Sequence, residues 1–218
     1  MEKYLKYIKN EIDKFSEPMI RNICMTEICK YIYLWEKYST DCSLNPLYDC
    51  NPFSYSEIRY EKHDFNFHTG EKITIHWDID KLYQIAMSTP TLKYNMSLND
   101  FENLLQSDLC ASLQELREIE QKVQSLCSHK YDPILVVNYK PIKCYILLDG
   151  RHRYIEYKKF KQNELLPVYI LDDELCFQSI INKKELLSYC IMHNIKVMND
   201  VMIGNTDFQK MINIDKIF

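Results

Sequence analysis

The chain has 218 residues, of which 46% are hydrophobic and 27% are charged, as expected for one well-packed core with or without an appendage. A net charge of −4 and only 3 glycines and 7 prolines argue against a protein that coats DNA with a basic face and against long flexible linkers. The nine cysteines have no disulfide-framework or Cys-x-x-Cys spacing, and no apolar run is long enough to span a membrane. We therefore expect a cytoplasmic protein with no membrane association.

The first forty residues indicate helices. The second helix is expected to begin at Ser16 or Glu17, because Pro18 is favoured in a first helical turn. Residues 40–56 are rich in turn-forming residues and predict a loop, so a helical N-terminal extension over 1–56 precedes the main domain. The apolar stripe of the second helix is approximated by Met19, Ile20, Ile23, Ile28 and Tyr31 or Leu34.

The middle of the chain combines one strand with several helices. Apolar and polar residues alternate over 72–77, which predicts a strand. Ser97 with Asp100 is typical of a helix start. A helix over 112–127 is predicted from one apolar face made of Leu113, Leu116, Ile119, Val123 and Leu126.

Short apolar runs predict three further strands, at 133–137, 145–148 and 167–171. The first two should form a hairpin that turns at residues 138–141, and the helix over 151–160 should follow the second. The predicted class is α+β, with one mixed sheet that includes 72–77 and is covered by the helix 112–127.

The last segment, 177–218, is expected to be a C-terminal helical extension. It should contain a helix over 183–193, a possible strand over 195–198 and a weak terminal helix.

The sequence Asp149-Gly150-Arg151-His152-Arg153 joins a strand to a helix. The first N–H groups of a helix and its dipole favour an anion, and Gly150 lets the backbone approach a ligand closely. Two arginines can bind phosphate oxygens, or one can bind phosphate while the other reaches a carboxylate such as Asp149. The alternative is a charged helix start whose arginines pair with surface carboxylates.

The stretch PILVVNYKPIKCYILLDGRHRYIEYKKFKQNELLPVYILDD resembles the ParB/sulfiredoxin superfamily. The resemblance covers residues 133–173 and extends loosely back to 72–77. It implies a ParB/sulfiredoxin-like domain over 57–176 that binds ATP or ADP, with CTP possible, together with magnesium. The phosphates would lie at Gly150, Arg151, His152 and Arg153.

Members of this superfamily differ in function. Arg151 stands where sulfiredoxins carry their cysteine, and the chain after Leu171 is too short and not basic enough for the helix-turn-helix domain of partition proteins. Leu148-Asp149-Gly150-Arg151-His152-Arg153 differs by one residue from the Leu-Asp-Gly-His-His-Arg of the free serine kinases. The resemblance therefore implies a kinase that phosphorylates a hydroxyl-bearing small molecule such as an amino acid.

Such a kinase needs a carboxylate near the substrate hydroxyl. Glu71, Asp78 and Asp80 are candidates, and we favour Asp78 together with Asp149 and His152 as the catalytic set. A helix N-cap is the structural alternative for Asp78 or Asp80. His152 could act in proton transfer, donate only to phosphate, or pack inward beneath its helix.

Other functions stay open. The chain could be a nucleotide-switched module that binds DNA, although nucleic acid is less expected at this net charge, or a partner protein through its first forty residues. Some superfamily members are nucleases. His63, His68 and His76 lie near Asp64, but they match no known ligand spacing, so we predict no metal ligands among them.

Overall fold

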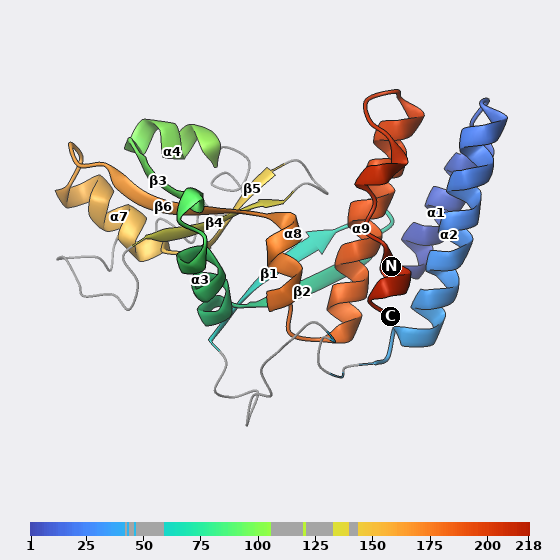
Figure 1. Cartoon of the computed structure of the whole chain (residues 1–218), viewed down its shortest axis with the longest axis horizontal. Coiled ribbons are helices and arrows are strands. Elements are labelled where there is room, and N and C mark those ends of the chain that lie inside the picture. The colour runs from blue at the N-terminus through green and yellow to red at the C-terminus, as the bar shows by residue number, and fades with distance from the viewer. Residues whose placement is uncertain (42, 44–45, 47–58, 106–119, 121–132, 140–143) are drawn as a thin grey trace. The chain divides into compact units, whose positions relative to one another are not determined.

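The computed structural model describes the chain except for residues 42, 44–45, 47–58, 106–119, 121–132 and 140–143 (Figure 1). The chain divides into two compact units. The first, here called the helical unit, combines Met1–Glu57, Lys62–Trp77 and Phe177–Phe218. The second, here called the sheet unit, combines Ile58–Glu61 and Asp78–Cys176. Both contain helices and strands, which confirms the predicted α+β class.

The helical unit contains two long helices and most of a β-hairpin, followed by a third long helix and short 3-10 turns. Its elements are α1 (Glu2–Asp13), α2 (Pro18–Tyr38), β1 (Tyr60–Asn66), β2 (Lys72–Asp78), η4 (Phe177–Ser179), α9 (Lys183–Met202), η5 (Phe208–Lys210) and η6 (Ile214–Lys216).

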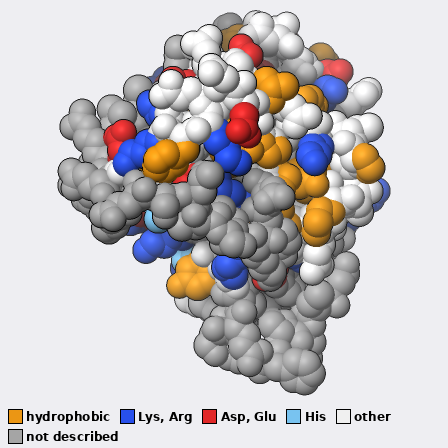
Figure 2. Space-filling view, turned by 90° about the vertical axis from the view of Figure 1, so that its left-hand side faces the viewer, with side chains coloured by type: hydrophobic (Ala, Val, Ile, Leu, Met, Phe, Trp, Pro, Cys, Tyr) orange, Lys and Arg blue, Asp and Glu red, His pale blue; other side chains and the backbone are white. Residues whose placement is uncertain are grey.

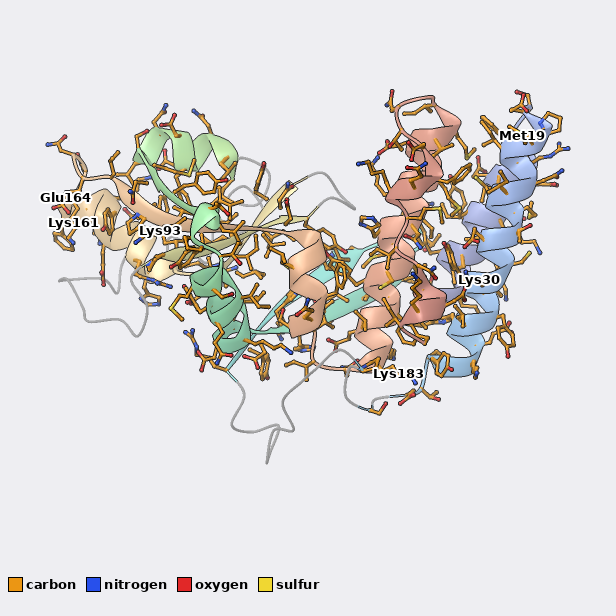
Figure 3. The ribbon with its side chains drawn as sticks, in the orientation of Figure 1. Met19, Lys30, Lys93, Lys161, Glu164 and Lys183 are labelled. Atoms are coloured by element: carbon orange, nitrogen blue, oxygen red, sulfur yellow. The ribbon has the colours of Figure 1, made fainter. Side chains whose placement is uncertain are left out.

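Helix α2 begins as the sequence predicts, and it buries part of the predicted stripe. Glu17 is its N-cap and accepts a hydrogen bond from the backbone of Met19. The buried residues are Cys24, Ile28 and Tyr31, whereas Met19 is 69% exposed at the end of α2 (Figure 3). Ile28 and Tyr31 of the predicted stripe are confirmed, whereas Met19 and Ile23 were wrong because they lie off the face defined by the i, i+4, i+7 spacing of the buried residues.

Helix α9 runs without a break through residues 195–198, so the strand predicted there was wrong. Asn182 caps its start by accepting from Glu185 N. Asn194 donates to the hydroxyl of Tyr31 at 3.0 Å and to the carbonyl of Ile212 at 2.8 Å. Burial on several sides outweighs the weak strand preference of the β-branched residues in this stretch.

The strands form two sheets instead of the single predicted one. β1 pairs with β2 alone, and the other sheet has the order β3-β6-β4-β5. The inclusion of 72–77 in the main sheet was therefore wrong. Strand β2 pairs with β1, in which Phe65 is the one hydrophobic residue described as buried. Strand β1 therefore carries no alternating apolar pattern that would predict it.

From residue 134 onward, the sheet unit follows the predicted hairpin-helix-strand order. Its elements are α3 (Ile79–Ser88), η2 (Pro90–Leu92), β3 (Lys93–Met96), α4 (Leu98–Leu104), β4 (Ile134–Tyr139), β5 (Cys144–Asp149), α7 (Arg151–Phe160), β6 (Leu166–Asp172) and α8 (Asp173–Cys176).

The pairing confirms the antiparallel hairpin of β4 and β5, while β6 runs parallel to β4 and antiparallel to β3. Half of the predicted turn, and all of the predicted helix 112–127 except residue 120, lies outside the described residues. The core on one side of the sheet contains side chains from α4, α7 and the strands, namely Phe101, Leu105, Ile134, Val136, Leu147, Tyr154, Ile155, Leu166 and Val168. None of the described helices is both long and apolar enough to cross a membrane.

Candidate functional site

The turn between β5 and α7 requires glycine. Gly150 has φ 108° and ψ 18°, and α7 begins at the next residue. A Cβ atom at Gly150 would lie 2.8 Å from Cγ1 of Ile134 and 3.1 Å from Nη2 of Arg153. The strand-glycine-helix arrangement predicted from the sequence is confirmed, and β4 and Arg153 pack directly against it.

Arg153 is buried beneath this turn, with 5% exposure. Its guanidinium donates to the carbonyl of Pro133 at 2.6 Å, to the hydroxyl of Tyr83 at 2.8 Å and to Oδ2 of Asp149 at 2.7 Å. One arginine thus reaches Asp149, as the sequence suggested. We call this set of contacts the Arg153 lock, because it ties the residue before β4 and the end of β5 to the start of α7.

Tyr83 of α3 completes the Arg153 lock. Its ring is buried, and its hydroxyl lies 2.8 Å from the carbonyl of Pro133 and 3.0 Å from Oδ2 of Asp149. Burial, followed by the negative charge of Asp149, raises the pKa of Tyr83, so the residue is a neutral hydrogen-bonding group at physiological pH. Nothing in the sequence singles it out among seventeen tyrosines.

Arg59 lies at the outer side of the same cluster. Its Nε is 3.3 Å from Oδ1 of Asp80, and its Nη1 is 3.5 Å from Oδ2 of Asp149. Its side chain is 42% exposed, and its guanidinium lies 5.9 Å from the ring centre of Tyr83. Sequence reasoning missed this residue because it follows a predicted loop and lies far from the turn along the chain.

The two polar residues of the first turn of α7 are accessible. His152 is exposed and Arg151 is partly exposed, so the inward-packing alternative for His152 was wrong. The parts that Arg151, His152 and Arg153 play in phosphate binding stay predictions.

The upstream carboxylates have separate environments. Asp78 caps α3 by accepting from Lys81 N at 3.0 Å, which confirms the N-cap alternative. Asp80 lies at the cluster through Arg59. Glu71 belongs to the helical unit, where the amino group of Met1 and the backbone of Tyr4 donate to it at 2.7 Å each. A catalytic role for Asp78 stays a prediction, whereas Asp80 contacts Arg59 of the cluster.

The histidines near β2 have structural neighbours. His76 Nδ1 lies 2.8 Å from Oε1 of Glu185, and the ring of His68 meets that of Tyr7 edge-on at 4.3 Å. The side chain of His63 lies outside the described residues. Within the part of the chain that the structure describes, no group of three metal-ligating side chains is brought together.

A hollow of about 350 Å³ lies within the helical unit. Two of its polar groups already have close partners, since Thr74 donates to Asp64 at 2.6 Å and Glu185 accepts from Asn182 at 2.7 Å. We assign it no function. Its lining consists of Met1, Trp35, Lys72, Ile73, Thr74, Asn182, Lys184, Glu185 and Ser188.

Surface charge on one described face is mixed. Figure 2 shows lysine and arginine side chains standing among acidic and hydrophobic ones. A DNA-binding surface requires basic residues gathered along one face, so this view adds no support for that alternative.

Comparison of the chain with protein families, with curated proteins and with solved structures gives no match. A function for this chain is therefore inferred from the residues of the sheet unit and from the resemblance described above.

Proposed function

We propose that the chain binds the phosphates of a nucleotide at the Gly150 turn and transfers a phosphoryl group to the hydroxyl of a small molecule, such as an amino acid. The observation that carries this proposal is the Arg153 lock, whose three short hydrogen bonds fix the turn from below. A helix start held in one direction presents its N–H groups and dipole to an anion without rearrangement. Arg151 and His152, on the accessible side of the turn, add charge-assisted donors.

The resemblance to the free serine kinases motivates the reaction. With ATP as donor, the bond between the γ-phosphorus and the β,γ-bridging oxygen breaks, and the γ-phosphorus forms a bond to the substrate oxygen. ADP leaves, and the hydroxyl proton passes to a carboxylate. With ADP as donor, the β-phosphoryl group moves and AMP leaves.

Asp80 is better placed than Asp78 to accept this proton. Its side chain is 33% exposed and lies at the cluster, whereas Asp78 is engaged as a helix cap. His152 would donate to the transferred phosphoryl group as its charge changes, in keeping with its exposed position on α7.

The carboxylates of the cluster fit a magnesium-nucleotide complex. The donors from Arg59, Tyr83 and Arg153 all meet Oδ2 of Asp149, so Oδ1 is the oxygen that could hold the cation, with Asp80 nearby. Magnesium prefers such oxygen ligands, and when bound it supplies positive charge to the phosphate oxygens.

Binding and transfer can be tested in turn. Thermal unfolding is first followed with ATP, ADP, CTP or GTP, each with magnesium, and a ligand at about 100 times its Kd should add about 2.7 kcal/mol to stability. Arg151→Ala should lose this effect, whereas Lys158→Ala, further along the same helix, should keep it. A lack of stabilisation by every nucleotide would refute the proposal.

Phosphorus NMR with a panel of hydroxyl-bearing amino acids then tests transfer. A new phosphate ester that forms at the expense of the nucleotide is the expected result. Binding without any ester would refute the transfer reaction and favour a nucleotide-switched binding module.

A further inference from the structure

We propose that Arg59 binds the terminal phosphate of the nucleotide by exchanging its contacts with Asp80 and Asp149 for phosphate oxygens. This inference rests on the function proposed above and assigns a residue that neither the sequence pattern nor the resemblance identifies. The geometry that carries it is the sharing of one carboxylate oxygen, Asp149 Oδ2, between Arg153 and Arg59.

The two arginines have different surroundings. The side chain of Arg153 is 6% exposed, and both of its terminal nitrogens donate to protein oxygens at 2.6–2.8 Å. Removing it from these acceptors would take a charged donor from a partly buried carboxylate and a partly buried carbonyl, which is costly. Arg153 therefore holds the turn and is poorly suited to move toward a ligand.

The two carboxylate contacts of Arg59 are easily exchanged. Its contacts with Asp80 and Asp149 are 3.3 and 3.5 Å long, near the outer limit for hydrogen bonds, and its side chain is 42% exposed. Ion pairs of this kind contribute little to stability. A phosphate group offers the same guanidinium a more favourable acceptor, because two of its oxygens can accept two N–H groups in parallel.

The exchange also changes the environment of Asp80. Arg59 and Arg153 balance the charges of Asp80 and Asp149 when no phosphate is present. Once Arg59 has turned to the phosphate, the Asp80 carboxylate loses this contact. Nucleotide binding would thereby change the contacts of the carboxylate to which the proposed reaction assigns the proton.

Calorimetric titration with magnesium-ATP, and with pyrophosphate as a probe of phosphate contacts alone, tests the assignment. Arg59→Ala should weaken the binding of both by about 10- to 100-fold, which corresponds to one charge-assisted contact. The affinity of Arg59→Lys for both probes should lie between those of Arg59→Ala and the wild type. Lys158→Ala is the matched control, since Lys158 is 49% exposed and pairs with Glu102 at 3.1 Å, and it should stay within about twofold.

A double-mutant cycle separates exchange from a structural role. If Asp80 competes with phosphate for Arg59, Asp80→Asn should tighten pyrophosphate binding several-fold in the wild-type background and by much less in Arg59→Ala. Equal effects in both backgrounds would show simple charge repulsion and would overturn the exchange. Should Arg59→Ala fail to fold, Arg59→Gln, which keeps a hydrogen-bond donor for Asp80, takes its place in the cycle.

The outcomes distinguish this inference from the proposed function. If the wild type binds neither probe, the proposed function and the role of Arg59 fail together. If the wild type binds both and Arg59→Ala binds them as tightly as Lys158→Ala does, only the role of Arg59 is overturned.

Discussion

Replacing Gly150 by alanine should destabilise the sheet unit by about 2–5 kcal/mol, from two separate causes. Placing an L-residue at φ 108° costs about 1–2 kcal/mol. The added methyl group would also lie 2.8 Å from the side chain of Ile134, which is fully buried and has little room to move. Overpacking of this kind costs about 1–3 kcal/mol more.

The other two glycines with positive φ are controls for the backbone part alone. Gly70 and Gly204 have φ 79° and 76°, and nothing lies within 4 Å of a Cβ placed at either. Alanine at these positions should cost only about 1–2 kcal/mol. The excess at Gly150 over these controls measures how firmly Ile134 and Arg153 are held against the turn.

Amide hydrogen exchange is the suitable assay. Both tryptophans, Trp35 and Trp77, belong to the helical unit, so tryptophan fluorescence does not report directly on the sheet unit. Mass spectrometry of peptides from β4 and β5 gives the free energy of opening around Gly150. If Gly150→Ala costs no more than Gly70→Ala in its own unit, the close packing described for the turn is not what limits this position.

Three further predictions follow from the lock and from α7. Arg153→Ala should cost about 3–5 kcal/mol in urea unfolding and weaken nucleotide binding, because it leaves the partly buried Asp149 without its closest cation. Lys158→Ala should cost less than about 1 kcal/mol. Equal losses for the two variants would contradict the structural role of Arg153. His152→Asn should keep nucleotide affinity, measured by calorimetry, and strongly lower turnover; unchanged turnover would reduce His152 to a hydrogen-bond donor. Burial, followed by the hydrogen bond to Glu102, raises the pKa of Tyr154 to about 12. The contribution of this residue to the free energy of unfolding is therefore full below about pH 10 and is lost as pH rises from about 10 to 12. Tyr154→Phe should flatten this decline when urea unfolding is measured across the pH range, and an unchanged dependence of stability on pH would contradict the prediction.

The sequence predicts those parts of the fold that depend on local pattern. The strands β4, β5 and β6 are short apolar runs, and Gly150 separates β5 from α7 at a position that needs a positive φ. β3 could not be found in this way, because three of its four residues are exposed and its pairing with β6 joins distant segments. Strand preference misled at residues 195–198, where packing keeps the chain helical.

Only the part of the candidate site that lies together along the chain could be predicted from the sequence. Asp149, Arg151, His152 and Arg153 are neighbours along the chain, so their chemistry can be read together. Tyr83 and Arg59 reach the turn only through the folding of segments 66 and 90 residues away from Asp149. Neither belongs to a recognisable motif, and so no pattern of spacing could have identified them.

The division of the chain has a consequence for its synthesis on the ribosome. The last residue of the sheet unit is Cys176, so this unit can complete its fold while the final segment is still being translated. Residues 177–218, which include α9, then take roughly 2–8 s to appear at about 5–20 residues per second. Until they emerge, the face of α2 that carries Ile28 and Tyr31 lacks the helix that supplies Asn194 to it. This face of α2 is therefore covered only after residues 177–218 have been made, and until then a chaperone would compete for it.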